Sequence, residues 1–233
     1  KAHYGDRLTM FEFNPDPGVK LSKIAGLADD LALVLGADAI RVLTPIPGKT
    51  SVGIEVPNKQ PHMVTFSDLL GTLNRAEKLN KQLPIALGKD VYNDVHVADL
   101  AEMPHLLISG TTGSGKSVFV NTLILSLMFL KSPKQLRFLM VDPKMIELSP
   151  YNGIPHLLKP VVTDVVEAKE LLVWAEKEMD RRYQLFSESG ARNIQSYNEK
   201  VTTQSQASVE RRTGRKMSSW EELPMIVVII DEL

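Results

Sequence analysis

The sequence has no cysteine among its 233 residues. Disulfide bonds and thiolate metal sites are therefore excluded, and the absence is compatible with a reducing compartment. Long hydrophobic runs are lacking as well: the longest, residues 123–130, is interrupted by Ser126. A membrane-spanning helix needs about 20 predominantly apolar residues, so this run is too short to cross a bilayer.

An excess of charge of either sign is also missing. The formal net charge is −1 and the pI is about 6.6, so a surface that binds a polyanion such as nucleic acid must be local. Hydrophobic residues make up 43% and charged residues 24%, which is usual for a globular chain with one large core or a small domain beside a larger one. The chain begins at Lys1 rather than Met and stops just after an apolar stretch. We therefore expect it to be a piece of a longer protein.

The first part of the chain, residues 1–83, is predicted to form a small α+β domain. Alternation of apolar and polar residues indicates its strands, and apolar residues at steps of three and four indicate its helix. In chain order we expect a half-buried strand around Phe11 and Phe13, one amphipathic helix from Leu21 to Leu35 that ends at Gly36, and strands at 40–43 and 52–56. This part carries no nucleotide-binding signature.

In residues 84–233 strands and helices alternate, which predicts an α/β domain with a mostly parallel central sheet. In chain order we expect a hairpin over 85–97, a buried strand at 106–109, a helix at 116–130, a strand at 136–141, a helix from Asp164 to Gly190 and a strand at 225–230. The second helix begins with a capping box, Asp164-x-x-Glu167. Residues 202–222 are polar with few large apolar groups, so we expect a flexible insertion there.

A glycine-rich loop follows the strand expected at 106–109. It matches G-x-x-x-x-G-K-[ST], and we expect it to bind the phosphates of a nucleotide through Gly110, Thr111, Thr112, Gly113, Ser114, Gly115, Lys116 and Ser117. Glycines let the backbone turn its N–H groups toward phosphate oxygens, and the following helix directs its positive end at the same anion. We expect Lys116 to contact the β- and γ-phosphates during catalysis and Ser117 to hold Mg²⁺.

The strand expected at 225–230 ends in two carboxylates, Asp231 and Glu232. Ligands of open α/β sheets bind at the carboxyl ends of the strands. We therefore expect Asp231 to hold Mg²⁺ and Glu232 to activate the attacking water as a general base. The strand is wholly apolar, which predicts a central position in the sheet. The order of the two motifs suits a RecA-like core, and because no N-K-x-D guanine-reading motif occurs, ATP is preferred to GTP.

Two groups of residues stay open between a functional and a structural role. Asp142-Pro143-Lys144 follows the strand at 136–141 and either senses nucleotide or a neighbouring subunit, or forms a surface pair, Asp142–Lys144 or Lys144–Glu147. Residues 181–216 hold eight Lys or Arg against three Glu. They either contact DNA phosphates or, as we favour, form a solvated face or loop.

Several blocks of the sequence closely resemble the FtsK/SpoIIIE DNA translocases. They lie at 103–117, 141–149, 153–158, 160–164, 181–183 and 191–193, and in the first part of the chain at 17–20, 46–49 and 53–58. Unrelated blocks in the same order are far more specific than a glycine loop alone. The resemblance covers nearly the whole chain except residues 202–222.

The resemblance implies a motor with an α domain, residues 1–83, and a RecA-like β domain, residues 84–233, which continues beyond the last residue of this chain. It implies a hexameric ring with double-stranded DNA in its channel and ATP with Mg²⁺ bound between neighbouring subunits. It also implies DNA pumping in chromosome segregation and cell division. Family members usually carry membrane helices as well, so the resemblance implies the cytoplasmic motor portion of a membrane-anchored protein, with site-specific recombinases as partners.

Two other functions stay open. The first is an FtsK/SpoIIIE-like ATPase that pumps protein in specialised secretion; it would share the glycine loop, but the blocks at 17–58 favour the DNA motor. The second is a nucleotide-gated binding module that does not hydrolyse ATP, against which the Glu232 carboxylate argues. DNA-stimulated ATP hydrolysis distinguishes the DNA motor from the protein pump.

Overall fold

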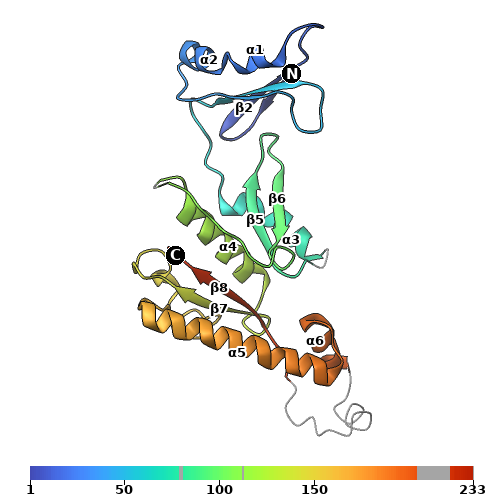
Figure 1. The fold of residues 1–233 in the computed structure, drawn as a ribbon, viewed down its shortest axis with the longest axis vertical. Helices are drawn as coiled ribbons and strands as arrows, with labels where there is room; N and C mark the ends of the chain where they lie inside the picture. The colour runs from blue at the N-terminus through green and yellow to red at the C-terminus, as the bar shows by residue number, and fades with distance from the viewer. Residues whose placement is uncertain (79–80, 112, 204–220, 233) are drawn as a thin grey trace. The chain divides into compact units, whose positions relative to one another are not determined.

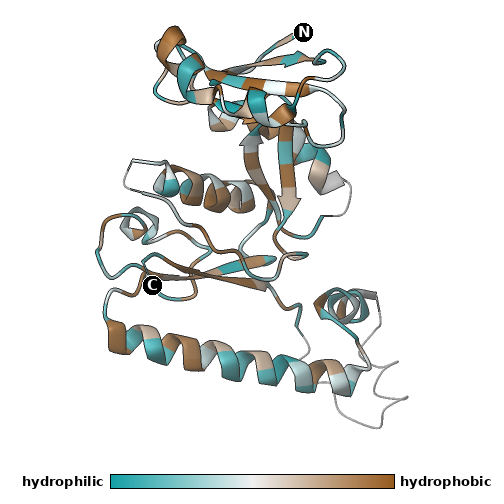
Figure 2. Cartoon of the chain, turned by 45° about the horizontal axis from the view of Figure 1, so that its top comes forward, coloured by the Kyte–Doolittle hydropathy of each residue, from teal (hydrophilic) through white to brown (hydrophobic). Residues whose placement is uncertain are grey.

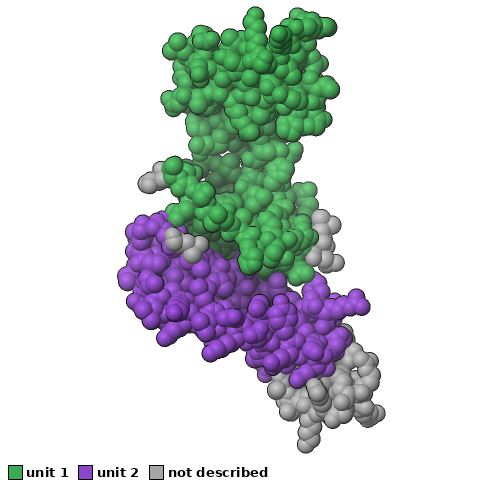
Figure 3. Space-filling model, in the orientation of Figure 1, with its two compact units in different colours: residues 1–126 green, residues 127–233 purple. Residues whose placement is uncertain are grey.

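The computed structural model describes residues 1–78, 81–111, 113–203 and 221–232. The chain divides into two compact units, residues 1–126 (unit 1) and residues 127–233 (unit 2), which are coloured separately in Figure 3 and are described here one at a time. No helix within the described ranges is long and apolar enough to cross a membrane.

Unit 1 opens with a four-stranded antiparallel sheet in the order β1-β2-β4-β3 (Figure 1). Its strands are β1 (Ala2–Tyr4), β2 (Leu8–Phe13), β3 (Arg41–Leu43) and β4 (Val52–Pro57). The three strands predicted in this part are confirmed, and β1 was not predicted. The buried side chain of β2 is Met10, whereas Phe11 is 45% exposed. Successive side chains of a strand point to opposite faces, so the phenylalanines share the face away from the core.

The single helix predicted over 21–35 is two helices, α1 (Leu21–Ala25) and α2 (Ala28–Leu35). They are separated at Gly26, a residue type that weakens a helix interior. Gly36 ends α2 in the left-handed conformation, with φ 63°, as predicted. No residue of either helix is buried, so the predicted apolar face is only partly covered.

Unit 1 continues with α3 (Phe66–Lys78), which was not predicted, and with the antiparallel hairpin of β5 (Pro84–Lys89) and β6 (Val95–Asp99), which was. Helix α3 packs against both strands of the hairpin. Asp99 at the end of β6 is buried, and its Oδ1 accepts a hydrogen bond from the backbone N–H of Leu83 at 2.8 Å. The Asp99 side chain therefore joins the end of β6 to the backbone that leads into β5.

The turn of this hairpin is tied to the N-terminal sheet within unit 1. Lys89 Nζ donates to Asp6 Oδ2 at 2.9 Å. The Asn93 side chain accepts from the backbone N–H of Asp6 at 3.0 Å and donates to the carbonyl of Tyr4 at 2.9 Å. Asn93 has φ 67°, a conformation that asparagine adopts more readily than most residues.

Helix α4 (Lys116–Leu130) has the bounds that the sequence predicted. Figure 2 shows it as mostly hydrophobic, and its residues Leu123 and Ile124 are buried. The Ser126 hydroxyl that interrupts the apolar run is buried and satisfied, since it donates to the carbonyl of Thr122 at 2.7 Å and accepts from the N–H of Ala86 at 3.2 Å. Buried hydroxyls are retained where such partners exist.

The buried strand predicted at 106–109 is not present, and this prediction was wrong. The structure assigns neither helix nor strand to these residues, and Leu107 is 82% exposed. An apolar segment becomes a strand only when a neighbour satisfies its backbone N–H and C=O groups. The described residues provide no such neighbour for it, so the glycine-rich loop follows an irregular segment.

Unit 2 is built on two parallel strands, β7 (Leu136–Val141) and β8 (Met225–Ile230), with Val141 opposite Ile230. Both strands have the predicted bounds and the predicted parallel direction. The central position predicted for β8 is not observed, because among the described residues it is paired with β7 alone. Apolar composition shows what a strand can bury, but a central position also requires a partner at each edge.

Helix α5 (Val165–Ser189) covers one face of this sheet (Figure 1). The Asp164 half of the predicted capping box is confirmed: Asp164 Oδ1 accepts from the backbone N–H groups of Val166 and Glu167 at 2.8 and 3.0 Å, whereas the Glu167 side chain pairs with Lys159. It ends at Gly190, which has φ 63°. Caps of this kind satisfy backbone groups that have no partner within the helix.

The core of unit 2 lies between the sheet and the first half of α5. Buried Leu139 and Val141 of β7 meet buried Leu171 of α5. Farther along the helix, Met179 and Tyr183 of the predicted apolar face are exposed. Helix α6 (Ile194–Thr203) and the short 3-10 helix η1 (Ser149–Tyr151) complete the unit. The predicted insertion at 202–222 begins inside α6, and its residues 204–220 lie outside the described residues.

Candidate nucleotide-binding site

The glycine-rich loop of unit 1 has the backbone that phosphate binding requires. Gly113 and Gly115 have φ 80° and 96°, in the left-handed region where side chains are disfavoured. A Cβ atom at Gly110 would lie 2.2 Å from Ser114 Oγ. Any residue other than glycine at this position therefore requires the Ser114 side chain to move. The N–H of Ser114 donates to the carbonyl of Thr111 at 3.0 Å. Thr112 lies outside the described residues.

Helix α4 begins at Lys116, directly after this loop. Lys116 and Ser117 are both partly buried, and the first turn contains no acidic residue that would compete for its N–H groups. A helix start of this kind favours an anion through its orphan N–H groups and its dipole. The loop and the helix start therefore fit a phosphate group, and the Ser117 hydroxyl is an oxygen ligand of the type that Mg²⁺ prefers.

The two predicted carboxylates lie in unit 2, at the end of β8. Asp231 is buried, and its backbone N–H donates to the carbonyl of Val141 at 3.0 Å. Glu232 has φ 55°, an uncommon conformation for a residue with a side chain. Because β7 and β8 are parallel, Asp142 leaves the sheet at the same edge. Its Oδ2 accepts from backbone N–H groups that follow it in the turn.

Lys144 has a partner that the sequence did not predict. Its ammonium forms an ion pair with the carboxylate of Glu232. Neither surface pair considered from the sequence, Asp142–Lys144 or Lys144–Glu147, is the contact that this ammonium makes. The sequence contained one signal for this contact. Asp142 and Asp231 each follow a strand of the expected parallel sheet, so Lys144 and Glu232, which come just after them, lie at the same edge of that sheet.

The structure thus gathers the predicted site residues into two groups. The phosphate loop, with Lys116 and Ser117, belongs to unit 1, and Asp231 and Glu232 belong to unit 2 together with Asp142 and Lys144. The roles assigned to these residues stay predictions.

Three of the four basic residues of 181–216 that the structure describes have partners inside the protein. Arg181 and Arg182 both donate to Glu178, at 2.6 and 2.7 Å. Lys200 donates to the carbonyl groups of Ser189 and Gly190 at 2.9 and 2.8 Å, at the end of α5. These contacts favour a structural role for the described part. The residues Arg211, Arg212, Arg215 and Lys216 lie outside the described residues.

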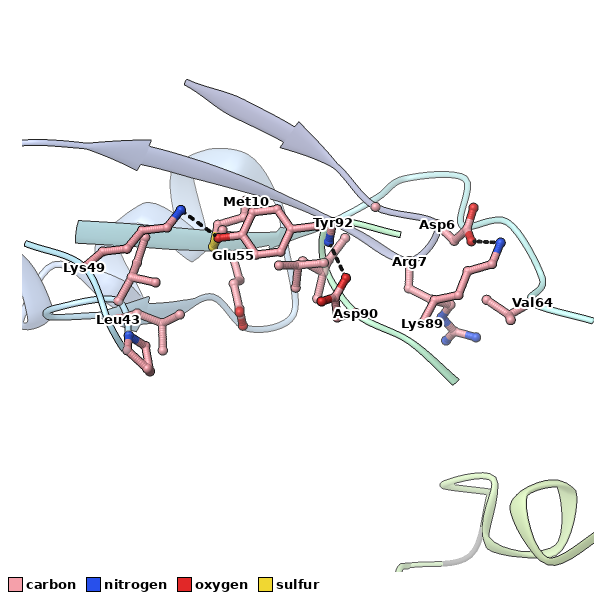
Figure 4. Close-up of a pocket in the computed structure, with 15 residues that line it drawn as sticks. Asp6, Arg7, Met10, Leu43, Lys49, Glu55, Val64, Lys89, Asp90 and Tyr92 are labelled. Carbon is pink, nitrogen blue, oxygen red and sulfur yellow. Dashed lines mark hydrogen bonds and ion pairs between the residues drawn. The ribbon is translucent and has the colours of Figure 1, made fainter. Parts of the chain in front are cut away.

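A cavity of about 440 Å³ lies elsewhere in unit 1, between the N-terminal sheet and the turn of the β5–β6 hairpin (Figure 4). Met10 and Glu55 line it from the strands, and Lys49 and Tyr92 from the loops. Its lining contains no residue predicted to bind nucleotide. The Lys49 ammonium donates to Glu12 at 2.9 Å and to the Tyr92 hydroxyl at 3.2 Å, so this lysine of the 46–49 block joins the sheet to the hairpin turn.

Glu12 beside this cavity is held as a carboxylate. Hydrogen bonds from Lys49 and then from Ser51 lower the pKa of Glu12 from its usual 4.5 to about 2. The same contact with Glu12 raises the pKa of Lys49 above its usual value. Both shifts stabilise the charged forms, so this contact persists through the neutral range.

Known proteins resemble this chain along its whole length. The FtsK/SpoIIIE family profile matches residues 72–233 and the FtsK alpha domain profile matches residues 1–58. The DNA translocase FtsK of Clostridium tetani is 50% identical over 229 residues, which cover 98% of this chain and 29% of that protein. The DNA translocase SpoIIIE of Bacillus subtilis is 47% identical over 234 residues, which cover 100% of this chain and 28% of that protein.

Among solved structures, the chain resembles the pCW3 conjugation coupling protein TcpA, in a monomer form with ATPγS. The identity is 20% and the TM-score 0.51, over 99% of this chain and 57% of that one. At this identity the likeness supports the fold alone.

The fold and these matches place the chain in the class of proteins with a P-loop fold. Within that class, the chain belongs to the FtsK/SpoIIIE family. The family and the fold class predicted from the sequence are therefore confirmed. The chain spans less than a third of the length of the curated relatives named above. The domain boundary between residues 83 and 84 stays a prediction.

Proposed function

We propose that this chain is the motor portion of an ATP-dependent double-stranded DNA translocase that acts in chromosome segregation and cell division. The observation that carries the proposal is the 47–50% identity to proteins named DNA translocases over 98–100% of this chain. The glycine-rich loop supports the ATP-binding half of the proposal, since its backbone and the α4 start suit a triphosphate.

In the proposed mechanism the chain's residues position and polarise the reactants. The loop N–H groups and Lys116 hold the phosphates, and Ser117 and Asp231 provide oxygen ligands for Mg²⁺. When bound, Mg²⁺ would neutralise the charge that develops on the phosphoryl oxygens. Glu232 accepts the proton of the attacking water as the water oxygen bonds to the terminal phosphorus, while the bond from that phosphorus to the β-phosphate oxygen breaks and ADP leaves.

The test is ATP hydrolysis by the full-length protein with duplex DNA, single-stranded DNA or no DNA. We expect duplex DNA to stimulate turnover most, and the motor to displace a third strand annealed ahead of it. Turnover that is indifferent to DNA but raised by a polypeptide substrate would instead support the alternative, an ATPase that pumps protein in specialised secretion.

The Glu232→Ala variant tests the predicted base. We expect ATP binding to persist while turnover falls by about a hundredfold or more, the usual contribution of a general base. Glu221→Ala is the matched control, because Glu221 is an exposed carboxylate just before β8. Hydrolysis by Glu232→Ala at the parental rate would remove Glu232 from the mechanism and would favour the nucleotide-gated binding module.

Family membership also supports a proposed assembly and location. We propose a hexameric ring with ATP bound between neighbouring subunits, and a cytoplasmic motor attached to a membrane-anchored protein. Site-specific recombinases are the proposed partners at the division site. Native mass spectrometry of the full-length protein with duplex DNA tests the ring, and a monomer at all concentrations would contradict it.

A further inference from the structure

The loop after β7 reaches the predicted general base. Lys144 leaves the sheet just beyond Val141, and Glu232 just beyond Ile230, which is the residue opposite Val141 in the parallel register. The two side chains meet in an ion pair between Lys144 Nζ and Glu232 Oε2. The pairing is therefore a consequence of the strand register and not of proximity in the sequence.

The position of Lys144 depends on a buried anchor. Asp142 is fully buried, and its Oδ2 accepts hydrogen bonds from the backbone N–H groups of Glu147 and Leu148 at 3.0 and 2.9 Å. The N–H of Met145 donates to the backbone carbonyl of Asp142 at 3.1 Å. The turn 142–148 is thus closed on itself, and it presents Lys144 from a fixed backbone.

The backbone is unusual on both sides of the ion pair. Met145, next to Lys144, has φ 58°, and Glu232 has φ 55°. Residues with a side chain adopt this region rarely, and they keep it only where the surroundings hold them there. Such conformations cluster at switch regions and active sites. The backbone on both sides of the pair is therefore held in an uncommon conformation by its surroundings.

We propose that Lys144 is a positioning residue that holds the Glu232 carboxylate in a resting orientation, and that ATP hydrolysis requires this ion pair to open. The inference rests on the proposed function, because it takes Glu232 as the general base. The ion pair engages Oε2 and holds the carboxylate toward the turn 142–148. In the proposal, this orientation turns Glu232 away from the attacking water, and opening of the pair releases it.

The side chains of Lys144 and Glu232 are both exposed, so the ion pair between them can break at little cost. The side chains of Lys144 and Glu232 are 58% and 43% exposed, and exposed ion pairs contribute little to stability. The buried anchor at Asp142 keeps the turn in place while the long lysine side chain moves.

The first experiment measures the ion pair without using catalysis. The full-length protein is treated with an amine-acylating reagent, and the rate at Lys144 is measured by mass spectrometry against exposed Lys134. We expect Lys144 to react about twofold or more faster in Glu232→Gln than in the parental protein, because the exposed pair is lost. ATPγS with duplex DNA should produce the same rise in the parental protein. Equal rates in all three samples would overturn the proposal.

The second experiment measures turnover. We expect Lys144→Ala to raise ATP turnover without DNA by up to about fivefold, the most that an exposed ion pair accounts for, with the KM for ATP unchanged. Lys144→Arg keeps the pair and should behave as the parental protein does, and Lys134→Ala controls for loss of a positive charge. A fall in turnover with a raised KM would show that Lys144 binds nucleotide, and unchanged turnover would show a surface pair only; either result overturns the proposal.

The two experiments separate this inference from the proposed function. If Glu232 is not the base, Glu232→Gln still hydrolyses ATP, while the labelling experiment reports on the pair as before. If Glu232 is the base but Lys144 does not restrain it, Glu232→Gln is inactive and Lys144→Ala matches the parental turnover.

Discussion

At the scale of single residues, the phosphate loop has room for no side chain at Gly110. A Cβ atom there would lie 2.2 Å from the hydroxyl oxygen and 3.3 Å from the Cβ atom of Ser114. We predict that Gly110→Ala clashes with the Ser114 side chain, shifts the loop backbone and weakens ATP binding by about tenfold or more, the effect of losing one well-placed hydrogen bond from a loop N–H group to a charged group. Binding of a fluorescent ATP analogue measures the loss.

Two further variants make this prediction specific. Gly71 lies within α3, and a Cβ atom added there would have no neighbouring atom within 4 Å. Gly71→Ala should therefore leave ATP binding unchanged and stabilise the helix by about 1 kcal/mol. Removing the hydroxyl in Gly110→Ala/Ser114→Ala should restore part of the affinity, because the closest contact is gone. Full affinity in Gly110→Ala alone would contradict the role of the loop.

We expect the positive charge of Lys116 to contribute more to ATP turnover than that of any other residue of the loop. We predict that Lys116→Ala lowers ATP turnover by about a hundredfold or more, as expected when a positioned charge that stabilises the transition state is removed, and that it abolishes translocation. Lys134→Ala, which removes an exposed charge before β7, is the control. Turnover of Lys116→Ala equal to the control would remove the loop from the site.

Single residues also differ in how well the sequence predicts their part in the site. The loop from Gly110 to Ser117 could be proposed as a phosphate site from the sequence alone, because it is continuous and its mechanism is local, and the roles of its residues stay predictions. The contact between Lys144 and Glu232 could not, because it requires the register of β7 against β8. The sequence placed Asp142 at the site edge of the sheet but offered no way to choose a partner for Lys144.

At the scale of elements, Glu178 joins α5 to the start of β8. It binds Arg181 and Arg182, and Arg182 in turn donates to the carbonyl of Pro224 at 2.8 Å. Hydrogen bonding from Arg181, against the opposing effect of burial, and then from Arg182 lowers the pKa of Glu178 from its usual 4.5 to about 2. The carboxylate therefore stays charged well into the acid range.

We predict that Glu178→Gln destabilises the folded state by about 1 kcal/mol near neutral pH, since the pair is partly buried. A pKa that is lower in the folded state gives stability that is fully present above about pH 4.5 and is lost as the pH falls toward 2. The difference between parental and variant proteins should therefore shrink over that window. Scanning calorimetry at several pH values measures it, with Glu176→Gln, an exposed glutamate of the same helix, as the control. A difference that does not vary with pH would contradict the charge-based account.

Elements could be predicted where the local pattern is strong and their packing is ordinary. The bounds of α4, β7 and β8 were obtained from apolar runs, and α5 from its two caps. The strand at 106–109 failed because a strand depends on a partner that its own sequence does not specify. Helix α3 was missed although the sequence signals it: its buried residues Leu69, Leu73 and Ala76 recur at helical spacing, and the carboxylate of Asp68 caps its start by accepting from the N–H of Thr65 at 2.8 Å.

At the scale of the whole molecule, each ATP site of the proposed ring lies between two subunits and therefore depends on both of them. We predict that mixing parental subunits with Glu232→Ala subunits lowers DNA-stimulated ATP turnover more steeply than in proportion to the fraction of variant, because an inactive neighbour in a closed ring also interrupts its partners. Titration of the variant at constant total protein measures this. A strictly proportional fall would contradict coupled subunits.

The parallel pairing of β7 with β8 has a consequence for how the protein is made. Leu136 pairs with Met225, and both α5 and α6 lie between them in the chain. During synthesis β7 emerges long before β8, so the edge that β8 occupies stays unpaired while the helices form, whereas the other edge is bridged at Phe138 and Val141 by Leu157 and Val162. Such non-local pairing is slow and exposes aggregation-prone surface. Early formation of α5 over Leu139 and Val141 would shield this strand, which gives the Asp164 cap a role in biogenesis as well as in stability.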